Sequence, residues 1–264
     1  MTRFLSRSSG FTLVELAMVL FIVSLLIGGL LMPLSAQNEV RGRQETDRAL
    51  ATIREALIGF AAINGRLPCP ADRTIASGVA NAGVEATTVA GGPCACTAAA
   101  SGIANVGGAI CDDDAPGGVT GVLPWATLGL SEGDAWGNRY TYRVSTRFAR
   151  LASGQTIFGG ACAPTSNPAA AAFALCSAGN MSVKTVAGGT DIATLVPVVV
   201  LSHGRNTLGA YMSNGTQVAG AVNDEAENAN GDANFVSNNN TDDQLTWLPT
   251  SILMGRMLSA GRLP

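Results

Sequence analysis

The chain has 264 residues, with 13% charged and 5% aromatic side chains and a formal net charge of -3. Outside the segment that follows the apolar N-terminal stretch, Lys and Arg form no cluster, which argues against nucleic acid as a main partner. Abundant glycine and alanine with few aromatic side chains are typical of a loop-rich domain rather than a helical bundle. The length left after an apolar segment of about 25 residues is enough for one soluble domain.

Residues 1–10, MTRFLSRSSG, contain Arg3 and Arg7 and no acidic residue, so positive charge keeps this leader on the cytoplasmic side. Residues 11–34 then form an apolar stretch that is long enough to cross a bilayer as a helix. A cleaved secretory signal is the alternative, but its apolar core would be shorter and would gain nothing from the ionisable Glu15. The sequence therefore predicts a single-pass membrane helix that places the rest of the chain outside the cytoplasm.

One carboxylate, that of Glu15, lies near the start of this apolar stretch. A charged group in hydrocarbon is costly unless it is paired or protonated. The side chain can also reach the headgroups at the membrane edge, which would explain the position of Glu15 but not the glycine at position 10. The pattern therefore indicates a functional carboxylate with a partner from elsewhere.

Residues 10–15, GFTLVE, followed by an uninterrupted apolar helix, resemble the cleavage and methylation signature of type IV prepilins and type II secretion pseudopilins. In that family a membrane peptidase cuts after the glycine and methylates the new amino terminus, which implies processing between Gly10 and Phe11. The resemblance also implies that Glu15 is an assembly residue, because the amine of a neighbouring subunit neutralises it as subunits stack into an open helical filament. The implied partners are other pilin-like subunits, the prepilin peptidase and methyltransferase, and an inner-membrane assembly platform.

Residues 35–63 continue the membrane helix as an amphipathic helix. Ile53, Leu57, Phe60 and Ile63 recur at spacings of three and four, and charged side chains occupy the other faces. Asn64-Gly65, followed by a proline, is expected to end the helix. Residues 64–264 are then the globular head, and the apolar stripe of the helix is expected to pack on its sheet.

Six cysteines all follow the apolar stretch, which favours disulfide bonds in an oxidising compartment. A zinc site is the alternative, but the closest pair has C-x-C rather than C-x-x-C spacing, and the single histidine is distant in sequence. The short loop between Cys162 and Cys176 makes them the first predicted pair, and Cys111 with Cys94 or Cys96 is the second. The six candidates are Cys69, Cys94, Cys96, Cys111, Cys162 and Cys176.

The best-patterned part of the head begins with residues 134–144, DAWGNRYTYRV, which read as a tight turn that leads into a strand. This segment resembles the Asp-Pro-Trp-Gly-x-Pro-Tyr element of major pseudopilins, with Ala135 and Arg139 in place of the prolines. We expect Gly137 to take an unusual backbone angle and Trp136 to anchor the turn in the core. Residues 195–202 are predicted to be one central strand, and residues 245–250 a short strand before a final helix over 251–260 with a hydroxyl N-cap.

An acidic segment lies between Arg205 and Arg256, where the sequence contains no Lys or Arg. Carboxylates in flexible, oxygen-rich sequence can bind calcium, which prefers several oxygen ligands. Major pseudopilins hold calcium in a loop with a similar order of elements, although the spacing differs and this loop is longer. A solvated acidic loop is the alternative. The candidate calcium ligands are Asp224, Glu225, Asp232, Asp242 and Asp243.

The predicted fold is α+β, with a long N-terminal helix packed on an antiparallel sheet in a loop-rich, disulfide-stapled, pilin-like head. The predicted function is that of a structural subunit of a type IV pilus or a type II secretion pseudopilus, stored in the bacterial inner membrane with its head in the periplasm. No enzyme activity is predicted, because Ser202 beside His203 lacks a G-x-S-x-G elbow. A membrane-tethered periplasmic module that binds a metal or ligand through the acidic segment is the alternative.

Overall fold

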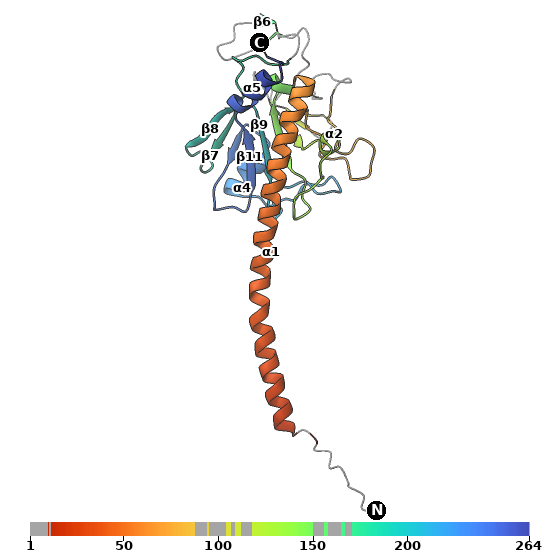
Figure 1. The fold of residues 1–264 in the computed structure, drawn as a ribbon, viewed down its shortest axis with the longest axis vertical. Coiled ribbons are helices and arrows are strands. Elements are labelled where there is room, and N and C mark those ends of the chain that lie inside the picture. The colour runs from red at the N-terminus through yellow and green to blue at the C-terminus, as the bar shows by residue number, and fades with distance from the viewer. Residues whose placement is uncertain are drawn as a thin grey trace, which may run out of the picture. The chain divides into compact units, whose positions relative to one another are not determined.

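A computed structural model gives the fold of the chain, which divides into two compact units, Met1–Gly42 and Arg43–Pro264 (Figure 1). Helix α1, Leu13–Asn64, is unbroken over 52 residues and contributes to both units. It ends where the sequence predicts, because Gly65 adopts a left-handed backbone with φ of 70°. The structure describes residues 10, 12–87, 94, 104–106, 109–111, 118–149, 156–157, 165–166 and 171–263, without the side chains of 28–36, 104–106, 109–111, 156–157 and 165–166.

The main sheet of the second unit is antiparallel throughout, which confirms the predicted α+β fold class. Its strand order in the described part of the chain is β1-β2-β3-β4-β9-β11, so β9 lies in the interior of the sheet. A short hairpin pairs β5 with β6. The bounds are β1 Ala104–Val106, β2 Ala109–Cys111, β3 Gly118–Val122, β4 Thr141–Ser145, β5 Thr156–Ile157, β6 Thr165–Ser166, β9 Val198–Ser202 and β11 Gln244–Leu248.

Two hydrophobic clusters cover the two faces of this sheet. Because side chains alternate along a strand, Val198 and Val200 join the cluster that contains Leu50, Ile53 and Leu57 of α1, whereas Val199 joins the other. A smaller sheet with the order β10-β7-β8 supplies the second cluster. The remaining bounds are α2 Trp125–Leu128, α3 Thr146–Ala149, β7 Met181–Lys184, β8 Asp191–Val196, α4 Asn223–Ala229, β10 Asn234–Val236 and α5 Thr250–Ser259.

The C-terminal segment holds the end of α1. Arg262 donates from Nε to the carbonyl of Ala62 at 2.7 Å and from Nη2 to the carbonyl of Ile63. These carbonyls belong to the last turn of α1, which has no helical partner for them. Leu253 and Met257 of α5 are fully buried in the same cluster as the apolar side of α1. The head is therefore built around residues 43–64 rather than merely attached to them.

The prediction of a single strand over residues 195–202 is wrong. The run is divided by Pro197 between β8, which belongs to the small sheet, and β9, which belongs to the main sheet. Leu195 has a φ of 56°, a left-handed conformation that is rare for leucine, and its exposed side chain points away from the core. Proline has no amide donor and so cannot continue a paired strand, which is why an apolar run of uniform composition changes sheet here.

The predicted hydroxyl cap of the final helix is also wrong. The N-cap of α5 is Pro249, without a side-chain cap. The hydroxyl of Thr250 instead donates to the carbonyl of Leu195 at 3.0 Å. Gly261 follows the helix with φ of 67°, as expected of a helix stop.

One disulfide bond, Cys69–Cys94, joins the start of the head to the segment that follows. This bond contradicts the pairing of Cys111 with Cys94, whereas the alternative pairing of Cys111 with Cys96 stays a prediction. The prediction assumed that cysteines close in sequence pair with each other. The fold instead brings together Cys69 and Cys94, which are 25 residues apart. Cys176 is also disulfide-bonded. Cys96 and Cys162 lie outside the described residues, so the pairing of Cys162 with Cys176 stays a prediction.

Replacing both Cys69 and Cys94 with alanine is expected to lower the free energy of unfolding by about 3 kcal/mol, because the open loop gains entropy in the unfolded state. Urea unfolding of the oxidised protein measures the difference. Oxidised protein with Ser259→Ala, a change of similar size at an exposed side chain, is the reference. Equal urea midpoints for the wild type and the double variant would contradict the prediction.

Candidate functional site

The first turn of α1 contains a capping box formed by Thr12 and Glu15. The Glu15 carboxylate, through Oε2, accepts hydrogen bonds from the Thr12 amide at 2.8 Å and from the Thr12 hydroxyl at 2.9 Å. In return, the Glu15 amide donates to the Thr12 hydroxyl oxygen at 3.3 Å. The sequence T-x-x-E builds this arrangement because residues three apart face each other at a helix start. The box holds the carboxylate at the N-terminal end of the helix.

Glu15 has no cationic partner along its own helix. The sequence from residue 8 to residue 40 contains no Lys or Arg, and Arg41 lies about 39 Å further along at 1.5 Å per residue. The side chains that flank Glu15 are apolar and exposed, including Val14 and Leu16. The positive charges nearest to this carboxylate in sequence are those of Arg7, Arg3 and the N-terminal amine, and another molecule is the remaining source.

Gly10 lies outside α1, is exposed, and has open space around the position of a Cβ atom. Phe11 lies outside the described residues. Among the residues whose side chains are described, which omit 28–36, no helix is long and apolar enough to cross a bilayer.

Comparison with known proteins bears on this same segment. A family profile described as the prokaryotic N-terminal methylation motif matches residues 5–31. The chain carries the prepilin-type N-terminal signature. That signature is the one found in type IV pilins and pseudopilins, and it includes Gly10, Phe11 and Glu15. No curated protein and no solved structure matches the chain.

The acidic segment does not assemble a metal site around the predicted ligands. Within the part of the chain that the structure describes, no three Asp, Glu, His or Cys side chains come together in a way that could hold a metal ion. The carboxylates bind amide groups instead, as when Asp224 accepts from the Ala187 amide at 2.8 Å and from Asn238 Nδ2 at 2.7 Å. The other pairs join Glu225 and Asp242 to Asn206, Asp232 to Asn230, and Asp243 to Asn228. In the described residues these carboxylates bind amide groups, and the calcium site stays a prediction.

A buried pair of titratable groups lies beneath this segment. His203 is fully buried at the end of β9, and its Nε2 atom is 3.0 Å from the Thr141 hydroxyl. Its Nδ1 atom lies 3.9 Å from Oδ1 of Asp243, whose side chain is 1% exposed. Burial lowers the pKa of His203 to about 4 and raises the pKa of Asp243 to about 7. Between about pH 4 and pH 7 both groups are therefore mainly neutral, as burial without a close ion pair favours.

The turn before β4 is held by Asp134 rather than by the tryptophan that the sequence suggested. Asp134 Oδ1 accepts from the amides of Trp136 and Asn138, both at 2.9 Å, while Oδ2 accepts from the Ser202 hydroxyl at 2.6 Å. Trp136 is only half-buried and belongs to none of the described core clusters. Gly137 has φ of 85°, as predicted. The turn is thus tied to β9 by a carboxylate.

Arg139 stands where the pseudopilin element usually has proline, and it has a role that the sequence did not predict. Its side chain is fully buried, donates from Nε to Glu132 at 2.7 Å, and lies over the ring of Trp125 at 4.8 Å. The guanidinium also donates to the backbone carbonyls of Arg73, Ile75 and Ser213 and to the Ser77 hydroxyl. One side chain therefore joins three loops that are distant in sequence.

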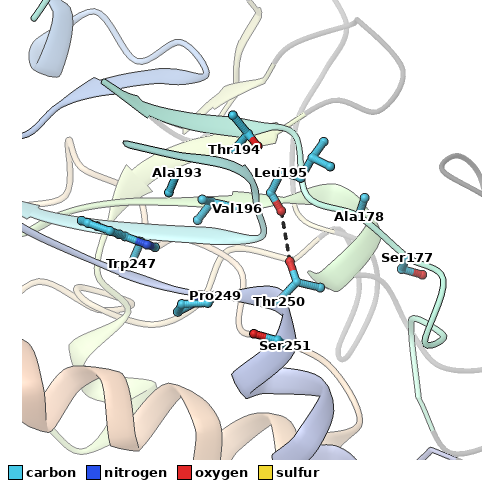
Figure 2. A pocket seen from close by; sticks show the side chains of 10 residues that line it. All are labelled: Ser177, Ala178, Ala193, Thr194, Leu195, Val196, Trp247, Pro249, Thr250 and Ser251. Atoms are coloured by element: carbon cyan, nitrogen blue, oxygen red, sulfur yellow. Dashed lines mark hydrogen bonds between the residues drawn. The ribbon is translucent and has the colours of Figure 1, made fainter. Parts of the chain in front are cut away.

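A pocket of about 330 Å³ opens between β8 and the start of α5 (Figure 2). Its wall is uncharged, with Val196, Trp247 and Pro249 as apolar surface and several hydroxyl groups beside them. The hydrogen bond from Thr250 to the Leu195 carbonyl crosses one side of it (Figure 2). None of the predicted site residues lines this pocket, and it contains no titratable side chain, so we assign it no chemistry.

Proposed function

We propose that the protein is a structural, non-enzymatic subunit of a type IV pilus or a type II secretion pseudopilus. The observation that carries this proposal is the prepilin-type signature at residues 5–31, with the Glu15 carboxylate held at the start of a 52-residue helix. A carboxylate in an apolar segment with no cation on its own helix needs a partner from outside that helix. An assembly role supplies one.

The proposed sequence of events begins in the inner membrane. Residues 1–10 stay in the cytoplasm, residues 11–34 cross the bilayer, residues 35–63 continue the helix, and residues 64–264 form the periplasmic head. The prepilin peptidase then cuts between Gly10 and Phe11, which creates an amine at Phe11. The oxidising periplasm suits the disulfide that the head contains.

Filament growth follows from the new amine. The amine of one subunit neutralises the Glu15 carboxylate of the next. This ion pair stabilises parallel packing of the two helices with an axial offset. Because this contact joins two different surfaces, it does not close on itself and instead repeats as an open helical filament. The assembly platform in the inner membrane would add each subunit from below.

Replacing Glu15 with leucine tests this proposal. Sheared filaments, examined by electron microscopy with immunogold against the head, are expected to fall at least tenfold, because an uncharged side chain gives the amine no partner. Membrane insertion is expected to continue, and filaments are compared at equal amounts of cleaved protein, because Glu15 also belongs to the capping box beside the cut. Glu45→Leu, which removes an exposed carboxylate of the same helix outside the apolar stretch, is the matched control and should assemble normally.

Normal filaments from Glu15→Leu would contradict the proposal. Gold label confined to envelopes in the wild type would favour a short pseudopilus over a surface pilus. If neither form of filament contains the protein, a membrane-tethered module that binds ligands through the acidic segment is the function to pursue.

A further inference from the structure

The start of α1 lies close to the proposed cut but does not include it. The helix begins at Leu13, whereas Gly10, which supplies the carbonyl of the bond to be cut, has no regular structure and is exposed. Thr12 marks the boundary, because its hydroxyl oxygen accepts from the Glu15 amide and its own amide donates to the Glu15 carboxylate. These bonds satisfy backbone and side-chain groups that would otherwise favour a further helical turn.

The sequence offers another place for the helix to begin. Ser8 and Ser9 are of the residue type that caps helices well, and a helix that began at either would include both residues of the Gly10–Phe11 bond. Gly10 opposes this extension, because glycine is a poor helix former. The cap at Thr12 opposes it too, since a helix that continues past Thr12 loses the capping box. Two adjacent features therefore favour the same boundary.

We propose that Thr12 is a positioning residue for leader removal: its capping box starts α1 at Leu13 and so leaves the Gly10–Phe11 bond outside the helix. This inference rests on the proposed processing at Gly10–Phe11. A peptidase binds the backbone of its substrate in an extended form, which a helix cannot offer because its amides and carbonyls are already paired. Hydrolysis adds water across the bond, so Gly10 gains the hydroxyl as a carboxylate and Phe11 gains the proton as an amine.

The rate of leader removal from the full-length protein tests the inference. In membranes that contain the prepilin peptidase, the fraction cut is followed over time by intact mass. Thr12→Val keeps the shape of the side chain but removes the cap, and we expect cutting to slow by about fivefold, which corresponds to a cap worth about 1 kcal/mol. Thr12→Ser keeps the hydroxyl and should be cut at the wild-type rate.

A second set of variants separates positioning from direct recognition by the peptidase. Adding Ser8→Ala and Ser9→Ala to Thr12→Val removes the upstream caps, so the cutting rate is expected to return to within about twofold of the wild type. Ser8→Ala with Ser9→Ala alone should leave the rate unchanged.

Two results would overturn the inference. One is a wild-type rate for Thr12→Val, and the other is a slow rate for Thr12→Val that the upstream alanines do not restore, since a contact between Thr12 and the peptidase would behave in that way. Failure of the proposed function is distinct from both, because in that case the wild-type protein itself would not be cut between Gly10 and Phe11.

Discussion

Replacing Arg139 with methionine is expected to lower the free energy of unfolding of the head by about 3 kcal/mol. Methionine fills similar space but donates no hydrogen bond, so the carbonyls of Arg73 and Ile75 lose the donor that Arg139 supplies. The Ser213 carbonyl also loses that donor but keeps the Ser77 amide at 2.7 Å. Glu132 loses its ionic partner, although its side chain is 29% exposed and water will compensate part of that loss. The substitution therefore releases three loops at once.

Urea unfolding measured by tryptophan fluorescence follows this change, because Trp125 lies directly under the guanidinium. Arg256→Met is the matched control. Arg256 pairs with Glu55 at 3.8 Å, but both side chains are more than half exposed, so its loss should cost under about 1 kcal/mol. Similar midpoints for the two variants would show that the buried contacts of Arg139 contribute no more than a surface ion pair.

Asp243→Asn is expected to change how stability depends on pH. Burial raises the pKa of Asp243 to about 7, so its contribution to stability is full below its unfolded pKa near 3.8 and is lost as pH rises through 7. Burial lowers the pKa of His203 to about 4, so its contribution is full above the unfolded pKa of 6.5 and is lost as pH falls through 4. Between pH 4 and pH 6.5 the two slopes are opposite and cancel.

Asparagine at position 243 removes one slope and leaves the other. The variant should gain about 2 to 3 kcal/mol of stability relative to the wild type as pH rises from 4.5 to 6.5, since one proton per molecule corresponds to about 1.4 kcal/mol per pH unit. His203→Gln should give the reverse slope. Urea unfolding at several pH values, with Asp191→Asn as a surface control, measures both. Parallel pH profiles for the wild type and Asp243→Asn would contradict this account.

The elements that were predicted correctly from the sequence are those whose conformation is determined by residues next to them in the chain. The end of α1 at Asn64 follows from Gly65, and β4 and β11 follow from alternating apolar side chains. The prepilin-type signature is likewise contained in one short segment. Such features depend on neighbours within a few residues, which a single sequence displays.

The features that the sequence could not predict depend on residues far apart in the chain. Arg139 occupies an alternating strand-like pattern that gives no sign of burial, and its partners come from loops about 64 and 74 residues away. The pairing of Cys69 with Cys94 and the binding of acidic side chains by asparagines have the same origin. The division of residues 195–202 is different, because Pro197, two residues after Leu195, is a local signal that the strand ends there.

The way the head encloses residues 43–64 determines how it would resist a pull along α1. Leu50, Ile53 and Leu57 are buried in the main cluster, and Arg262 holds the last carbonyls of the helix. Tension applied along the helix at residue 43 loads all of these contacts at the same time, as in shear. It does not break them one after another, as in peeling. Shear loads many contacts at once, so the rupture force should be high and should fall most when buried residues of the helix are truncated.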